Sequence, residues 1–231
     1  MTIVQIFGLE HPDDALAAAE IGIEHLGLSI GDYFLPHHMS VEDGKRIIAS
    51  LPPDAKTVAL FATPDVDLVR RVVDAVHPAM IQVCWEDEAL GRDVEGRLRE
   101  SIAPVKVIKE IAVGGPQTRD TAMSAAARYA PVADFLILDT APPDIAWIGA
   151  TGRTHDWTIS RDIVAASPVP CILAGGLGPD NVTAALEAVH PYGADSYTHT
   201  NEPGSVRRKS RQRMQAFYDA VKAFDRAMKA E

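Results

Sequence analysis

Short runs of β-branched and aliphatic residues recur eight times along the 231 residues, with helical stretches between them. The runs are TIVQIF, IEHLGLSI, KTVALFA, AMIQVCW, VKVIKEIAV, DFLILD, PCILAGG and ADSYT. Several are nearly continuous in apolar residues, which is typical of parallel strands covered on both faces. Parallel strands need helical crossovers, and a closed sheet has no exposed edge. The pattern therefore predicts an α/β fold, a (β/α)8 TIM barrel, with a doubly wound open sheet as the alternative.

Two of the helical stretches carry clear start and stop signals. In PDVDLVRRVVDAVH the valines keep helical spacing, and Pro64 suits a first turn, where its missing N–H costs nothing. Asp65 and Asp67 suit the positive end of the helix dipole. HPDDALAAAEIG repeats this logic, with Pro12 entering the helix and Gly22 available to end it.

Length and composition limit the classes of protein to which the chain can belong. A chain of 231 residues fits one barrel, so we expect a single domain over residues 1–231. No segment approaches the roughly 20 unbroken apolar residues of a membrane span. The formal charge of −10 argues against nucleic acid as a partner, because such binding needs a basic face.

Two local features refine this picture. The segment RRKSRQR places five basic residues at the start of the last expected helix, where we expect a solvated helix face. The two cysteines, Cys84 and Cys171, lie in apolar runs, and no secretory leader pattern precedes the first strand. A reduced, cytoplasmic setting is the expectation.

In a barrel of this kind, active sites are built from the loops at the carboxyl ends of the strands. The residue pairs at those ends are therefore the candidates for function. They are Phe7-Gly8, Cys84-Trp85, Asp139-Thr140, Gly175-Gly176 and Thr198-His199.

The segment ILAGGLGPDNV is typical of an anion site. Paired glycines after a strand let the backbone approach a ligand closely, and the helix opened by Pro179-Asp180-Asn181 presents N–H groups to it. A second glycine turn, with basic residues behind it, follows strand eight in NEPGSVRRKS. The alternative is that the glycines only serve a tight turn. If phosphate binds here, a bulkier residue at Gly176 should weaken phosphorylated ligands with little effect on the core.

Other side chains with catalytic chemistry are few. Asp139 closes the buried run DFLILD and is either a general acid/base or a helix cap and loop brace. His37 and His38 lie together in a loop, but no third ligand is recognisable by spacing, so we expect no metal site. The absence of Walker, GxSxG and HExxH motifs argues against metal-dependent and serine hydrolases.

The chain resembles phosphoribosylanthranilate isomerase, a family of tryptophan-pathway barrels that perform an Amadori rearrangement on a phosphoribosyl amine. The resemblance spans nearly the whole length. It rests on GLEHPDDALAAAEIGIEHLGL, FATPDVDLV, IQVCWEDE, FLILDT, GATGRTHDW and PCILAGGLGPDNVTAALEAVHPYGAD, in the family's order and at its spacing.

The family's chemistry implies an acid and a base. The acid protonates the furanose ring oxygen to open the ring, and the base removes the C2′ proton from the resulting iminium ion. Asp139 matches the acid by motif position. The family's base is a cysteine in a Lys-Ile-Cys-Gly sequence, where this chain has Gln5-Ile6-Phe7-Gly8. A phenyl ring cannot accept a proton.

Other positions depart from the family as well. His37 replaces an arginine that helps to hold the substrate, and Cys84 and Trp85 replace a His-Gly pair after strand four. Tyr197-Thr198-His199 replaces the Ser-Ser-Gly phosphate turn after strand eight. The residues that the resemblance assigns to the substrate are Phe7, His37, Trp85, Gly152 and Arg153, and those that it assigns to phosphate are Gly175, Gly176, Asn181, Thr198 and His199.

Two functions fit these departures. The chain is either an aldose–ketose isomerase of a phosphorylated sugar, with its base supplied by Cys84, His37 or His199, or a catalytically silent barrel that binds a phosphosugar. The retained Asp139 favours the isomerase, with an altered substrate or base, and Asp139 and Cys84 are its candidate catalytic residues. No cofactor is expected, and the chain is expected to be a monomer or a homodimer.

Overall fold

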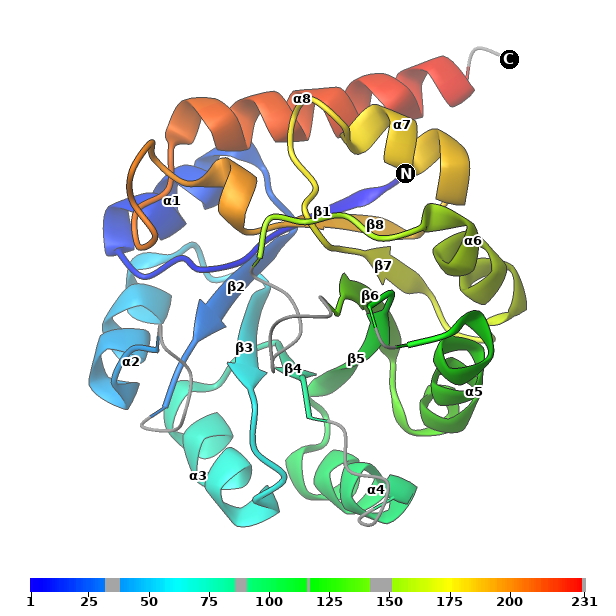
Figure 1. Ribbon diagram of the computed structural model, residues 1–231. Helices are drawn as coiled ribbons and strands as arrows, with labels where there is room; N and C mark the ends of the chain where they lie inside the picture. The colour runs from blue at the N-terminus through cyan, green and yellow to red at the C-terminus, as the bar shows by residue number, and fades with distance from the viewer. Residues whose placement is uncertain (32–37, 86–90, 116, 142–150, 230–231) are drawn as a thin grey trace.

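A computed structural model describes residues 1–31, 38–85, 91–115, 117–141 and 151–229, apart from the side chains of residues 91–93 and 95. Its strands form a closed parallel barrel in chain order, with β1 paired to β8, which confirms the predicted (β/α)8 fold (Figure 1). The strands are β1 (Ile3–Ile6), β2 (His25–Ser29), β3 (Thr57–Phe61), β4 (Met80–Val83), β5 (Lys106–Val113), β6 (Phe135–Thr140), β7 (Cys171–Leu173) and β8 (Gly193–Ser196).

Helices surround the barrel, and each follows the strand of the same number. They are α1 (Pro12–Ile21), α2 (Val41–Ser50), α3 (Val66–Val76), α4 (Gly91–Ile102), α5 (Arg119–Tyr129), α6 (Trp157–Ala166), α7 (Val182–Val189) and α8 (Arg211–Met228). Two 3₁₀ helices, η1 (Ala130–Val132) and η2 (Thr198–Thr200), complete the described elements. The prediction that strand eight ends near Thr198-His199 is therefore wrong, because β8 ends at Ser196 and these two residues belong to η2. The Asn201 N–H donates to the Thr198 carbonyl and closes this short helix.

Alternation along the strands separates two apolar clusters. Residues such as Val4, Ile6 and Leu136 point outward and pack against the helices. The inward-facing cluster consists of Phe7, Val58, Met80, Ile108, Phe135, Ile137, Ile172 and Ala174. The remaining inward positions include polar side chains, and these are the groups available for chemistry inside the barrel.

The predicted start and end of the first helix are confirmed, and the predicted start of the third helix is wrong. Pro12 is the first residue of α1, and Gly22 ends it with φ 95°, as predicted. Helix α3 begins later than predicted, at Val66, because the Asp65 carboxylate accepts the Leu68 N–H at 2.9 Å and caps the helix. Pro64 therefore precedes the helix and is not in its first turn.

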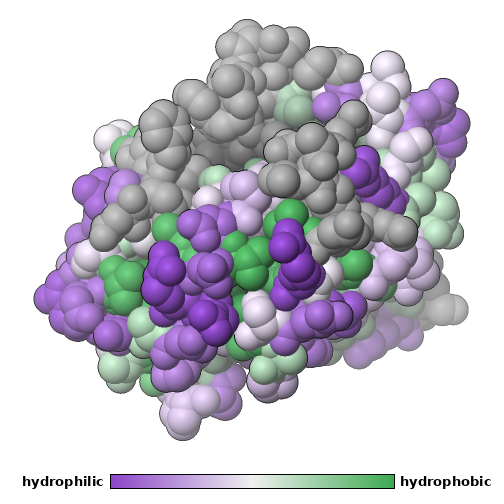
Figure 2. All heavy atoms as spheres, turned by 90° about the horizontal axis from the view of Figure 1, so that it is seen from below, coloured by the Kyte–Doolittle hydropathy of each residue, from purple (hydrophilic) through white to green (hydrophobic). Residues whose placement is uncertain are grey.

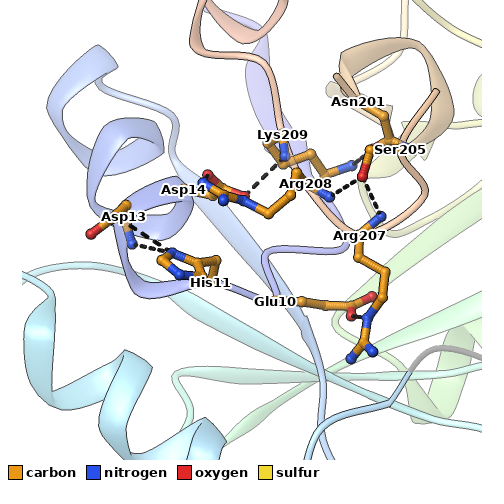
Figure 3. Close-up of polar contacts among 9 residues, drawn as sticks. All are labelled: Glu10, His11, Asp13, Asp14, Asn201, Ser205, Arg207, Arg208 and Lys209. Atoms are coloured by element: carbon orange, nitrogen blue, oxygen red, sulfur yellow. Dashed lines mark hydrogen bonds and ion pairs between the residues drawn. The ribbon is translucent and has the colours of Figure 1, made fainter. Parts of the chain in front are cut away.

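The prediction that RRKSRQR forms a solvated helix face holds for Arg211 and Arg213, which lie exposed on α8, but not for Arg207, Arg208 and Lys209, which precede the helix. Helix α8 begins at Arg211, and the residues before it bind α1 and the turn that leads into it (Figure 3). Arg208 makes a two-pronged ion pair with Asp14, with both N–O distances 2.9 Å. Lys209 is only 4% exposed, and its Nζ donates to the Tyr197 carbonyl at 2.7 Å and to Asn201 Oδ1 at 2.6 Å. These bonds fix the segment between β8 and α8 across the start of α1.

The outer surface is that of a solvated barrel. Figure 2 views it from the α3 and α4 side, where hydrophilic side chains predominate and hydrophobic atoms show between them. Among the described residues, no helix has the length and apolarity that crossing a membrane requires.

Candidate active site

Two aspartates lie at the same level inside the barrel, on strands that flank β7. The register pairs Leu138 with Leu173 and Leu173 with Ala194. The next residue of each chain segment, Asp139, Ala174 and Asp195, therefore points inward in one row. Adjacent parallel strands lie about 4.8 Å apart, so the two aspartate Cα atoms are roughly 10 Å apart, with only the methyl group of Ala174 between their side chains.

Both aspartates line one small cavity at the carboxyl ends of β6, β7 and β8. Its volume is about 20 Å³, which is room for one water molecule. The lining residues are Asp139, Gly152, Gly175, Gly176, Leu177, Asp195, Tyr197 and Thr198. The structure thus brings together five of the residues named from the sequence: Asp139, Gly152, Gly175, Gly176 and Thr198.

The surroundings of the two carboxyls favour their neutral forms. Desolvation by burial raises the pKa of Asp139 to about 6, against the opposing hydrogen bond from the Thr140 N–H at 2.7 Å. Burial and the nearby charge of Asp139 raise the pKa of Asp195 to about 8, although Gln5 and Lys209 oppose the shift. At neutral pH the two groups therefore hold about one proton between them, and the titration belongs to the pair.

The glycine turn after β7 needs glycine for two reasons. Gly175 and Gly176 have φ of 83° and 62°, which side-chain-bearing residues rarely adopt. A Cβ on Gly176 would also lie 2.6 Å from the backbone carbon of Arg153. A bulkier residue at Gly176 would therefore displace the loop containing Arg153, which packs directly on this turn, and its small effect on the core stays a prediction.

Asn181 braces the turn with both ends of its side chain. Its Oδ1 accepts the Gly178 N–H at 2.8 Å, and its Nδ2 donates to the Gly176 carbonyl at 3.0 Å. Its predicted phosphate contact is thus unsupported by the geometry. Within the described residues, the N–H groups of Gly175, Gly176 and Leu177 donate to no acceptor, so three backbone donors remain available beside the cavity.

The loop before α6 and the 3₁₀ helix η2 meet above this turn. The His199 ring bonds the Gly152 carbonyl through Nε2 at 3.2 Å, and a Cβ on Gly152 would lie 3.3 Å from the Thr198 side chain. His199 therefore braces the rim of the cavity without being among its lining residues.

Phe7 is 6% exposed and belongs to the inward apolar cluster. It packs closely on Gly27 of β2, because a Cβ on Gly27 would lie 2.6 Å from Phe7 Cδ2. Tyr197 lies over Gly8 in a similar way, with its Cδ2 atom 2.8 Å from a Cβ built there. The two rings thus fill the barrel mouth at the end of β1, and Phe7 is not among the residues that line the cavity.

Cys84 and Trp85 follow the end of β4, and their side chains contact other groups than the cavity. The Cys84 thiol donates to the Phe61 carbonyl at 3.3 Å, and burial, together with the charge of Glu110, raises its pKa well above the usual value. Trp85 packs in the outer cluster, and its carbonyl accepts a hydrogen bond from Lys109 Nζ. Neither lines the cavity. His37 lies outside the described residues.

Several groups at the site went unnoticed in the sequence. Asp195 lies inside the short run ADSYT. The pattern that could have identified it is an acidic residue at an inward position of a buried strand, as for Asp139 in DFLILD. The His155 ring bonds Thr140 Oγ1 at 2.9 Å and Ser160 Oγ at 2.6 Å. No spacing rule connects these residues, because they meet only through the fold.

Comparisons with known proteins agree with this geometry. A family model described as N-(5′-phosphoribosyl)anthranilate (PRA) isomerase matches residues 4–197. A protein of that name from Methanocella arvoryzae is 35% identical, with 84% of this chain and 87% of the relative covered. One from Haloferax volcanii is 32% identical, with 99% and 94% covered.

Solved structures show the same fold. Phosphoribosyl anthranilate isomerase from Thermotoga maritima superposes with a TM-score of 0.78 at 25% identity. The match covers 96% of this chain and 100% of that one. A second structure of such an isomerase, in complex with reduced 1-(o-carboxyphenylamino)-1-deoxyribulose 5-phosphate, gives a TM-score of 0.76 at 24% identity, covering 96% of this chain and 100% of that one.

Proposed function

This chain belongs to the N-(5′-phosphoribosyl)anthranilate isomerase family, and we propose that it catalyses the Amadori-type conversion of a phosphorylated ribosyl amine into a 1-amino-1-deoxyketose. The observation that carries this proposal is the placement of Asp139. Its carboxyl, with a raised pKa, lies in one cavity with the glycine turn whose N–H groups suit a phosphate. A proton donor and an anion site thus lie on the same rim.

Asp139 acts as the acid of the first step. A carboxyl with a pKa of about 6 is partly protonated at neutral pH and can donate to the furanose ring oxygen as the C1′–O bond breaks. The iminium ion that forms makes the C2′ proton acidic. A base then removes that proton, and the enolamine tautomerises to the ketone.

The phosphate is held by backbone donors after β7 and β8. The unbonded N–H groups of Gly175, Gly176 and Leu177 are the first set, and Thr198 contributes from the other side of the cavity. Backbone N–H groups in a glycine turn bind anions through fixed dipoles and need no basic side chain. The substrate's phosphate end is therefore retained.

The other half of the site differs, which supports an altered base, substrate or both. Phe7 fills the end of β1 with a buried phenyl ring, where the family has its cysteine base. The aromatic wall of Phe7 and Tyr197 changes the shape that the amine substituent meets. We propose that phosphoribosylanthranilate itself is used poorly unless another group supplies the base.

The test is a direct assay with phosphoribosylanthranilate, alongside Asp139→Asn and, as control, Asp74→Asn, which changes an exposed carboxyl on α3. Removal of a positioned acid typically lowers the rate about 10²- to 10⁴-fold, so Asp139→Asn should lose kcat while its KM stays within a few-fold. Binding of the phosphorylated ligand with no turnover by the wild type, on any aminoribose phosphate tried, would favour the silent barrel. Equal losses of binding and rate in Asp139→Asn would mean that this residue only braces the loop.

A further inference from the structure

We propose that Asp195 is the second proton-transfer group of this site and takes the C2′ proton in place of the missing cysteine. This inference rests on the proposed isomerase function. It assigns the step that Phe7 cannot perform to a carboxylate on the adjacent strand, β8, which pairs directly with β1.

The position of Asp195 fits the role. It shares a row of the barrel with Asp139 and lines the same cavity, so one bound ligand can contact both carboxyls. It lies across the sheet from Gln5, two residues before Phe7. Compared with position 7, the proposed base thus lies on the neighbouring strand, β8, and one inward-facing layer lower in the barrel.

The Asp195 side chain is buried but incompletely bonded. It is 7% exposed, and its Oδ1 has no hydrogen-bond partner among the described residues. A buried polar atom without a partner is costly, and such atoms are uncommon unless a ligand or water completes them. Asp195 is one of the residues that line the cavity, so a ligand bound there lies beside this carboxyl.

The groups that shift the pKa of Asp195 are two charged residues, Asp139 and Lys209, and the neutral amide of Gln5, which forms a hydrogen bond. Asp139 on β6 disfavours its ionised form, while Gln5 on β1 and Lys209 before α8 favour it. Lys209 is itself buried beneath Tyr197, with its Nζ 4.3 Å from the ring centroid. A carboxylate held in such a site is a stronger base than one in water, because burial raises its pKa.

The other candidates for the base are less suited. The Cys84 thiol is engaged with the Phe61 carbonyl, and its raised pKa leaves little thiolate at neutral pH. The His199 ring is engaged with the Gly152 carbonyl at the rim. Neither residue lines the cavity, whereas Asp195 does.

The proton balance closes within the pair. In the resting site Asp195, which has the higher pKa, holds the shared proton, and the reactive form is the minor one in which that proton lies on Asp139 and Asp195 is ionised. From this form Asp139 gives its proton to the ring oxygen, and the C1′–O bond breaks to leave an iminium ion. Asp195 takes the C2′ proton, and the C–H electrons form the C1′=C2′ bond and neutralise the iminium. Tautomerisation then moves a proton from the C2′ hydroxyl to C1′. One proton remains on the pair, now on Asp195, and its return to Asp139 resets the site without an added reagent.

The first test measures turnover of phosphoribosylanthranilate by the wild type, Asp195→Asn and the control Asp74→Asn, an exposed carboxyl on α3, with folding checked by circular dichroism. Asp195→Asn should lower kcat about 10²- to 10⁴-fold with KM within a few-fold, while Asp74→Asn keeps the wild-type rate. A folded Asp195→Asn with kcat within about threefold of wild type would overturn the assignment, even though the isomerase function stood.

The second test needs no turnover. Carboxyl ¹³C signals of labelled aspartate, titrated in the wild type and in Asp139→Asn, report the pair directly. We expect Asp195 to titrate near pH 8 in the wild type and lower in Asp139→Asn, because the charge that raises its pKa has been removed. Titration of Asp195 near the ordinary value in the wild type, or no change in the variant, would overturn the pair. A wild type inactive on every phosphorylated ribosyl amine tried, but with this coupling, would instead refute the proposed isomerase function and leave the carboxyl pair standing.

Discussion

The ring of Phe7 packs so closely against Gly27 of the neighbouring strand β2 that a single added carbon on Gly27 would lie 2.6 Å from Phe7 Cδ2. The two residues belong together: glycine at position 27 makes the room that the phenyl ring occupies. The aromatic residue is built into the barrel.

Gly27→Ala should therefore destabilise the fold. Adding a methyl group to a closely packed site forces side chains off their rotamers or shifts the backbone, at a cost of about 1 to 3 kcal/mol. Gly96→Ala is the matched control, since a Cβ there meets nothing within 4 Å and alanine favours the helix. Urea unfolding of the two variants measures the difference. A Gly27→Ala protein as stable as Gly96→Ala would show that Phe7 moves aside freely.

Gly176→Ala should impair both stability and anion binding. Its φ of 62° is unfavourable for alanine, and the added carbon would meet the Arg153 backbone at 2.6 Å. Thermal unfolding measures the first effect, and isothermal titration with inorganic phosphate measures the second. Weaker phosphate binding than in Gly204→Ala is expected; Gly204 also has a positive φ of 77°, but a Cβ on it meets open space. Equal phosphate affinity in the two variants would place the anion elsewhere.

The regular parts of this structure were predictable because they depend on local patterns. Runs such as DFLILD and PCILAGG mark strands by their apolar continuity, and Asp139 and the glycine pair were visible as polar or small residues at their ends. Asp195 was not predicted because it lies inside the predicted run ADSYT, whereas only residues at the strand ends were taken as candidates for function. The burial of Lys209 could not be predicted because its contacts are distant in the sequence. Its backbone N–H, for example, donates to Asp14, which lies 195 residues earlier.

The neutral state of His155 should make stability depend on pH. Burial lowers its folded pKa to about 4, from about 6.5 in the unfolded chain, so between these values the unfolded chain binds more protons. Stability therefore falls as the pH drops from about 6.5 to 4. Urea unfolding at pH 7, 5.5 and 4.5 should show a shallower fall in His155→Gln, since contributions from His25 and the two aspartates are common to both proteins. Parallel pH curves would mean that His155 is protonated in the fold.

Phe7→Cys tests whether restoring the family's base is enough. We expect little gain in phosphoribosylanthranilate turnover, because a base acts only on a substrate held in reach, and the walls formed by Tyr197 and the altered rim remain. The new thiol would also lie in the inward apolar cluster, which disfavours its thiolate. Removing the ring beside Gly27 should in addition cost about 2 to 4 kcal/mol, as large-to-small core changes do.

The companion variant Cys84→Ala separates the two remaining explanations for any activity of the wild type. If Asp195 is the base, Cys84→Ala keeps kcat within about threefold, because its thiol is bonded to the Phe61 carbonyl and lines no part of the cavity. A wild type that turns over at about 1 s⁻¹ or faster would refute poor use of phosphoribosylanthranilate. Loss of that turnover in Cys84→Ala, with Asp195→Asn unaffected, would transfer the role of base to the thiol. A rise of tenfold or more in Phe7→Cys would instead show that the substrate still binds against the end of β1, in the family's manner.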